Sequence, residues 1–187
     1  MRSSYVEPGP LGLVLAALQP TNRLVFEVML VTGLRVGDVL NLRTEQVQRQ
    51  RFTVREAKTG KTRRVYIPKD LQLRLLSQAG RLYCFEGRND WRRPRTRQAV
   101  WKDCKRVARF FQSSGAVPKK ASVSPHSARK VYAVGEYRRT GNLDAVRRKL
   151  NHDPAHVATT LVYALSDQLT PEELKSMAPA KRRGRKE

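Results

Sequence analysis

Acidic residues are scarce in this sequence. Sixteen aspartates and glutamates stand against 38 lysines and arginines, so the 187-residue chain carries a formal net charge of +22. Such an excess predicts a polyanionic partner, because neutralised phosphates release their condensed counterions. Basic residues are spread over the chain from Arg43 to Lys186 and are not confined to one tail, which favours a folded positive surface over an appended basic arm. Charge alone leaves DNA, RNA and the ribosome open as partners.

Cysteines and long apolar runs are also few. Cys84 and Cys104 match neither a metal-binding spacing nor a disulfide framework, so we expect two reduced thiols. No run approaches the roughly 18 apolar residues of a membrane span, and residues 1–8 lack the apolar core of a secretory signal. No carboxylate cluster or Cys/His set suggests a metal site. We therefore expect a cytoplasmic protein without a membrane segment, a metal or a cofactor.

Apolar periodicity predicts a mainly α-helical α+β fold with one small sheet. Residues 51–57 and 63–67 alternate apolar and polar side chains on either side of Thr59-Gly60, which predicts an antiparallel β-hairpin. A helix is expected over residues 21–32, with Thr21 as its N-cap and Gly33 as its stop. Further helices are expected over residues 36–42, 70–78, 98–111, 126–139, 143–150 and 155–164.

Two basic motifs in the first third of the chain contain candidate functional residues. Arg35 lies at a predicted helix junction, where its planar guanidinium can bind two phosphate oxygens and Asp38 can hold it in place. Lys58 lies beside the predicted hairpin tip and can reach a leaving oxygen or a base edge. Each motif alone is also compatible with a surface salt bridge or with general phosphate contact.

The second half of the chain adds histidines and a tyrosine. His126 and Arg129 are three residues apart near a predicted helix N-terminus, so they share a face with the free backbone N–H groups that attract an anion. A later stretch contains His152, His156 and Tyr163. Tyr163 lies at helical spacing from several apolar residues, and taken alone it is typical of a core aromatic.

The order of these motifs is more specific than any one of them. Thr-Gly-Leu-Arg-x-Gly-Asp, Lys-Thr-Gly-Lys ahead of a strand ending in Pro, Pro-His-x-x-Arg-Lys, Leu-Asn-His and Thr-Thr-Leu-x-Tyr follow one another over residues 21–165. In this order and at these separations they resemble the catalytic domain of the tyrosine recombinases, the phage integrase family. The resemblance implies a tyrosine-recombinase-like catalytic domain, mainly helical, with a small antiparallel sheet in its N-terminal third.

By this resemblance, the chain is expected to cleave and rejoin DNA at specific sites through a 3′-phosphotyrosyl intermediate, without metal or ATP. Tyr163 is the expected nucleophile, and Lys58 is expected to protonate the leaving 5′-oxygen. Two arginines and two histidines are expected to bind the scissile phosphate, with one acidic residue in support: Arg35, Arg129, His126, His152 and Asp38. Two alternatives stay open, namely a type IB topoisomerase and a non-catalytic basic protein that binds nucleic acid.

The sequence departs from the family pattern in three ways. His152 and Tyr163 are eleven residues apart, which is longer than usual, and His156, seven residues before the tyrosine, is the competing assignment. We favour His152 because Leu-Asn-His resembles the usual Leu-Gly-His. Lys130 stands where many members have histidine. Only about twenty residues precede the first motif helix, so we expect either an isolated catalytic domain or a minimal enzyme.

The resemblance also implies partners and an organisation. Double-stranded DNA is the expected partner, with self-association into a dimer or tetramer on DNA and with accessory DNA-bending proteins as further candidates. The length fits a single domain over residues 1–180, with residues 1–20 as a lead-in. Residues 166–180 are equally compatible with two arrangements: packing on a neighbouring protomer, or covering their own domain. Residues 181–187 are expected to form a disordered basic tail.

Overall fold

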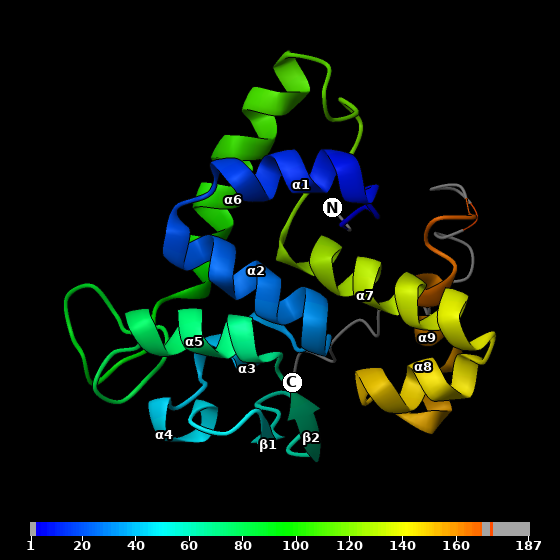
Figure 1. The fold of residues 1–187 in the computed structure, drawn as a ribbon. Coiled ribbons are helices and arrows are strands. Elements are labelled where there is room, and N and C mark those ends of the chain that lie inside the picture. Colours follow the sequence, from blue (N-terminus) through cyan, green and yellow to red (C-terminus); the bar gives the residue numbers. More distant parts are fainter. Residues whose placement is uncertain (1–2, 170–172, 174–187) are drawn as a thin grey trace, which may run out of the picture. The chain divides into compact units, whose positions relative to one another are not determined.

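The computed structural model describes residues 3–169 and residue 173 (Figure 1). Its contacts divide the chain into two compact units, residues 1–132 and 133–187, and the boundary falls within helix α7. The first unit contains α1 (Pro8–Ala17), α2 (Pro20–Thr32), α3 (Val36–Leu40), α4 (Thr44–Val47), β1 (Arg51–Arg55), β2 (Thr62–Tyr66), α5 (Lys69–Gln78), α6 (Arg97–Ser113) and the start of α7 (Pro125–Thr140). The second contains the rest of α7, α8 (Leu143–Leu150), the 3-10 turn η1 (Pro154–His156) and α9 (Val157–Ala164).

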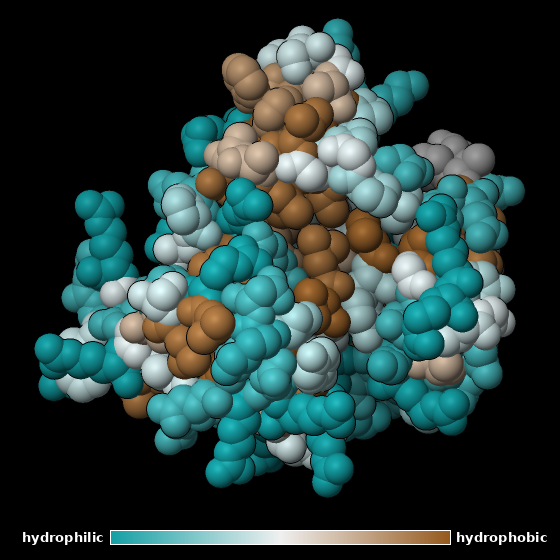
Figure 2. Space-filling model, in the orientation of Figure 1, coloured by the Kyte–Doolittle hydropathy of each residue, from teal (hydrophilic) through white to brown (hydrophobic). Residues whose placement is uncertain are grey.

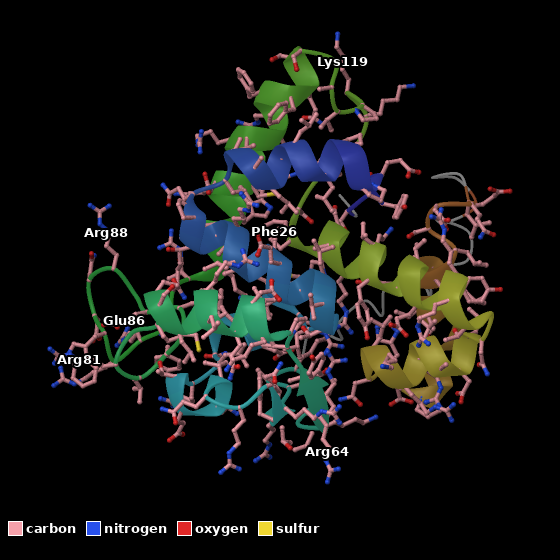
Figure 3. All side chains as sticks on the ribbon, viewed as in Figure 1. Phe26, Arg64, Arg81, Glu86, Arg88 and Lys119 are labelled. Atoms are coloured by element: carbon pink, nitrogen blue, oxygen red, sulfur yellow. The ribbon has the colours of Figure 1, made fainter. Side chains whose placement is uncertain are left out.

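The core of the first unit is built around α2. Val25, Phe26, Val28 and Met29 recur at helical spacing and are fully buried, and Phe26 is labelled on α2 in Figure 3. Helices α1, α3 and α5 pack against α2, and α6 packs against α1 and α3. Burying each large apolar side chain contributes about 1.5 to 3 kcal/mol. This packed group of helices supports the α2–α3 link and the hairpin turn, in which Arg35 and Lys58 lie.

The predicted hairpin is present as the two-stranded antiparallel sheet of β1 and β2. Its register pairs Arg51 with Tyr66 and Arg55 with Thr62. Alternation along each strand turns Val54 and Val65 inward, while most of the other side chains stay exposed. The connecting turn includes Gly60 in the left-handed region at φ 67°, and two backbone hydrogen bonds close it, Glu56 N–H to Lys61 O and Gly60 N–H to Glu56 O.

The second unit is a small helical assembly in which α8 packs against α9. The side chain of Asn142 caps α8 by accepting hydrogen bonds from the N–H groups of Asp144 and Ala145. At the other end of α8, Asn151 takes a left-handed conformation at φ 53°. Asparagine tolerates this region better than most residues. The left-handed residue turns the chain so that His152 follows directly, which explains how Leu-Asn-His replaces a Leu-Gly-His pattern.

The mainly helical fold with one small sheet is confirmed, and the helix boundaries differ in a few places. Helix α2 begins at Pro20 with Gln19 as its N-cap, so Thr21 is not the cap. A proline at the first helical position needs no N–H partner, and this favours the earlier start. Helices α1 and α4 were not expected, because α1 is apolar on all sides and α4 has only four residues. The expected helix over 155–164 begins as a 3-10 turn.

Hydrophilic side chains cover much of the surface seen in Figure 2, as the composition requires. Among residues 3–169 and 173, no helix is both long enough and apolar enough to cross a membrane. Most of the C-terminal segment over residues 166–180, for which two packing modes were considered, lies outside the described residues, as does the basic tail over 181–187.

Candidate active site

Arg35 is placed by the short link between α2 and α3. Gly33 ends α2 in the left-handed region at φ 63°, and its N–H donates to Met29 O at 2.8 Å. A Cβ at Gly33 would lie 2.4 Å from Cδ1 of Tyr132, so only glycine fits both the backbone and the packing. Leu34 is buried next to it and anchors the link. Arg35 follows as the N-cap of α3.

The main partner of Arg35 is Glu56 and not Asp38. Arg35 Nη1 donates to Glu56 Oε2, whereas the nearest oxygen of Asp38 is 4.0 Å away. Glu56 is fully buried, and its Oε2 also accepts a hydrogen bond from the Thr59 hydroxyl at 3.1 Å. Asp38 serves the hairpin instead, since its Oδ1 accepts the N–H of Ala57 at 2.9 Å. Both carboxylates therefore connect α3 to the segment that contains the candidate lysine.

A second arginine completes this buried network. Arg63 Nε lies 3.6 Å from Glu56 Oε1, and Arg63 Nη2 donates to Thr32 O at 2.6 Å. Burial lowers the pKa of Arg63, and the adjacent Glu56 carboxylate opposes that shift. Oε1 of Glu56 has no hydrogen bond among the described residues, so the ion pair with Arg63 is its principal compensation. The network ties the hairpin to the end of α2 and fixes the position of Arg35.

Basic residues gather around His126 within the first unit. Partial burial is the largest cause that lowers the pKa of His126. Four positive charges lower this pKa further: Arg129, Arg35, Lys58 and Arg97. The side chain of His126 still has an exposed face, so its hydration is reduced and not lost. Lys58 is exposed in the hairpin turn, and Arg97 is exposed at the start of α6. Cations brought this close to one histidine form a field that favours an anion.

Arg129 is the most buried of these cations. Its side chain is only 1% exposed, and Nη1 donates to the carbonyl of Gly33. Arg129 lies one helical turn after His126 at the start of α7, so both side chains belong to the same face of the helix. The glycine that ends α2 thus positions both candidate arginines, one through the chain link to Arg35 and the other through its carbonyl oxygen.

The second unit brings His152 and Tyr163 together. Their ring centroids are 5.4 Å apart in an edge-on arrangement. His152 Nδ1 lies 3.1 Å from the Thr160 hydroxyl, and both side chains are buried. Thr160 precedes Tyr163 by one turn of α9, so this helix places both partners of the histidine. The other candidate, His156, falls in η1, and the preference for His152 stays a prediction.

The structure adds three residues that sequence reasoning missed, namely Glu56, Arg97 and Thr160. Glu56 had a readable signal, because it follows Phe52 and Val54 at alternate positions and thus continues the inward face of β1 one residue beyond the end of the strand. A charged residue on such a face must be paired. Thr160 lies within the Thr-Thr-Leu-x-Tyr motif, but helical spacing alone did not reveal a bond to His152. Arg97 has no local signal, since only tertiary packing brings it to His126.

The described residues contain no group of three or more His, Cys, Asp or Glu side chains arranged to hold a metal ion. The groups that are present offer a different kind of chemistry. Cations in the first unit can bind and stabilise an anion. The phenol in the second unit can act as a nucleophile, with a histidine beside it.

Comparison with known families and structures supplies independent information. The family model described as the phage integrase family matches residues 13–169. The crystal structure of XerA recombinase superposes with a TM-score of 0.66 at 24% identity, covering 95% of this chain and 64% of that chain. A search of curated proteins found no significant match.

Two further solved structures have similar folds. The Tn1549 transposon integrase, in complex with circular intermediate DNA, gives a TM-score of 0.69 at 15% identity, covering 94% of this chain and 66% of that one. A lambda integrase dimer bound to a COC′ core site gives 0.68 at 16% identity, covering 91% and 62%. The chain therefore spans just under two thirds of the length of these structures, and the likeness establishes the fold.

Proposed function

The chain belongs to the phage integrase family, and we propose that it is a site-specific DNA recombinase that cleaves and rejoins strands through a 3′-phosphotyrosyl intermediate. The observation that carries this proposal is the arrangement of cations within one unit: Arg129 donates to the carbonyl of Gly33, two residues before Arg35, and Asp38 accepts the N–H of Ala57, the neighbour of Lys58. The positive charges of these three cations also lower the pKa of His126. A phosphodiester attracts such a group of cations, and fixed positive charge stabilises the additional negative charge of the transition state.

In the proposed step, the phenolic oxygen of Tyr163 attacks the scissile phosphorus. A bond from phosphorus to the tyrosine oxygen forms, and the bond from phosphorus to the 5′-oxygen breaks. The tyrosine loses its proton as the attack proceeds, and Lys58 donates a proton to the leaving 5′-oxygen. Arg35 and Arg129 bind the non-bridging oxygens, because guanidinium groups suit two oxygens at once.

His152 and His126 are proposed to hydrogen-bond the same phosphate. The Thr160 hydroxyl at 3.1 Å from His152 Nδ1 restricts the ring, and Nε2 is the nitrogen proposed to face the phosphate. If that hydroxyl donates to Nδ1, the proton resides on Nε2, which then acts as a donor. Asp38 is proposed to support Arg35 indirectly, through its hydrogen bond to the backbone N–H of Ala57.

Rejoining follows by the same chemistry in reverse. A 5′-hydroxyl attacks the phosphotyrosyl link, the tyrosine leaves, and a phosphodiester is restored. One phosphate ester replaces another at each step, so the joining of strands requires no nucleotide cofactor and none is proposed. Attack by the original 5′-hydroxyl would relax supercoiled DNA, whereas attack by that of a second duplex exchanges strands.

The proposal includes the partners and the location. Double-stranded DNA is the substrate, and a dimer or tetramer on DNA is the proposed acting form. The lambda integrase structure is described as a dimer on a core site, and the Tn1549 integrase as a complex with DNA, which supports this view. Accessory DNA-bending proteins and a cytoplasmic, DNA-associated location belong to the same proposal.

A covalent trapping experiment tests the function. The protein is incubated with a library of nicked duplexes whose core sequence is randomised, so that cleavage releases a short strand and prevents rejoining. We expect an SDS-stable protein–DNA adduct that is lost in Tyr163→Phe. Tyr66→Phe, which changes an exposed tyrosine of β2, is the matched control and should retain the adduct. An adduct in Tyr163→Phe, or none from the whole library, would overturn the proposal.

A further inference from the structure

A basic loop of fixed shape precedes α6. Residues 86–94 are closed by a bridge between Glu86 and Pro94 and by the hydrogen bond from Gly87 N–H to Arg93 O at 2.8 Å. A Cβ at Gly87 would lie 2.8 Å from Arg93 O and 2.9 Å from Asp90 O, so the two arms of the loop meet at a glycine. Figure 3 shows Arg88 extending from this loop into solvent. The loop therefore presents its arginines from a defined backbone.

An open cavity of about 640 Å³ lies between this loop, the N-terminal part of α6 and Gln19. We call it the loop–α6 groove. Five basic side chains line it: Arg88, Arg93, Arg95, Lys102 and Arg106. Two carboxylates, Asp90 and Asp103, also line it, so five positive charges less two negative charges leave +3. The groove therefore suits an extended anion that has more than one negative charge.

The charges in the loop–α6 groove are not equally available. Arg106 pairs with Asp103 at 2.6 Å, and Arg93 lies 3.6 Å from Asp90. Asp103 remains ionised at neutral pH: burial raises its pKa, but hydrogen bonds from Asn22, Arg106 and the Gln19 backbone, with the positive charge of Arg106, lower it overall. The other three cations that line the groove do not form an ion pair of this kind with a described residue.

Arg88 and Lys102 are the available cations of the groove. Both side chains are exposed, and neither forms an ion pair with any residue in the described part of the chain. The Arg95 guanidinium, in contrast, donates to Asn22 Oδ1 at 2.8 Å and to Gln19 Oε1 at 3.2 Å. Arg88 and Lys102 can thus bind an incoming anion without first breaking an ion pair.

One cation of the candidate active site, Arg97, directly follows a residue that lines the groove. Thr96 lines the groove, and the next residue, Arg97, lowers the pKa of His126 through its charge. The Arg97 Cδ atom would lie 3.5 Å from a Cβ placed on Gly37, which is in the helix that Arg35 caps. Lys102 lies five positions after Arg97 in α6, a rise of about 7.5 Å along the helix. That rise matches about two phosphates of one DNA strand, which follow at about 3.4 Å along the axis.

We propose that the loop–α6 groove holds the sugar–phosphate backbone of the DNA strand that flanks the cleaved phosphate. Arg97 contacts the phosphate nearest the active site, and Lys102 and Arg88 contact the phosphates that follow. These contacts position the duplex without reading its sequence, because they address only the backbone. The inference rests on the proposed function, since the cleaved phosphate defines where the flanking strand begins.

Salt-dependent binding of a fluorescent duplex tests the groove. Arg88→Gln/Lys102→Gln removes the two available cations, and Lys119→Gln/Lys120→Gln removes two exposed cations beyond the other end of α6 (Figure 3). Each phosphate contact contributes about 0.9 to the slope of log affinity against log salt. We expect the groove double variant to lose about 1.8 of that slope and the control to keep the wild-type value. Equal slopes in the two double variants would overturn the proposal.

Two further measurements separate this inference from the function itself. Ethylation interference should show that the phosphates at which the groove double variant differs from the wild type lie within about three positions of the cleaved one. Cleavage at saturating DNA should be unchanged in the groove variant, with only KM raised. A loss of kcat with an unchanged salt slope would contradict the groove and leave the recombinase proposal intact. Absence of any covalent adduct, with the slope difference present, would overturn the recombinase proposal and leave the groove only as a binding site for the DNA backbone, with no cleaved phosphate beside it.

Discussion

Replacing the buried carboxylate of Glu56 should damage both stability and cleavage. Glu56→Gln keeps the shape of the side chain and removes the charge that separates Arg35 from Arg63. Removing one partner of a buried ion pair costs about 3 to 5 kcal/mol. Arg35 and Arg63 retain 18% and 11% side-chain exposure, so the lower end of that range, about 3 kcal/mol, applies. A domain of this size would lose roughly 6 to 12 °C in Tm.

Cleavage should suffer separately, because Arg35 loses the group that fixes its guanidinium. A misplacement of about 1 Å in a catalytic group can cost about 100-fold in rate, and we expect a loss of that order at saturating DNA. Thermal unfolding and single-turnover cleavage of nicked DNA, measured below the transition, give the two values. Glu45→Gln, at an exposed glutamate of α4, is the control. If Glu56→Gln behaves like this control in both assays, the buried network does not position Arg35.

Three other perturbations follow from the same structure. Gly33→Ala should destabilise the protein by about 1 to 3 kcal/mol in urea unfolding, because its Cβ would overlap the Tyr132 ring, and an unchanged midpoint would contradict the packing. The pKa of His126 measured by NMR should lie below its ordinary value and should rise when DNA is bound. Because the folded state disfavours the protonated ring, the stability that His126 contributes is present above a pH of about 6.5 and is lost as pH falls through the lowered pKa. Burial raises the pKa of the Cys84 and Cys104 thiols to about 12, so a thiol reagent at pH 8 should modify neither until the protein unfolds, and rapid labelling of the native protein would refute their burial.

Most of the fold was predicted from helical and strand periodicity, because the hairpin and each of the longer helices bury one apolar face. The failures have physical causes. Helix α1, PGPLGLVLAA, has no polar face and two internal glycines, so its helicity depends on packing against α2 and α6. The N-cap of α2 is Gln19, two residues before the expected Thr21, because Pro20 can begin a helix.

The candidate site was predictable as a set of residue types but not as a network. Motif order pointed to Arg35, Lys58, His126 and Arg129, and the charges around His126 agree with that grouping. Asp38 is expected to hold Arg35 and lies 4.0 Å from it, but the closer partner of Arg35 is a buried glutamate in the hairpin, Glu56. Sequence spacing favours partners within one helical turn, whereas the closest partner here is 21 residues away and directly follows strand β1.

The most direct test of the central claim identifies the amino acid that becomes attached to DNA. Trapped adduct from the nicked library is digested with nuclease and protease, and the nucleotide-bearing peptide is sequenced by tandem mass spectrometry. We predict a 3′-phosphate ester on Tyr163. Attachment at any other side chain, with Tyr163 unmodified in the adduct, would contradict the proposed mechanism.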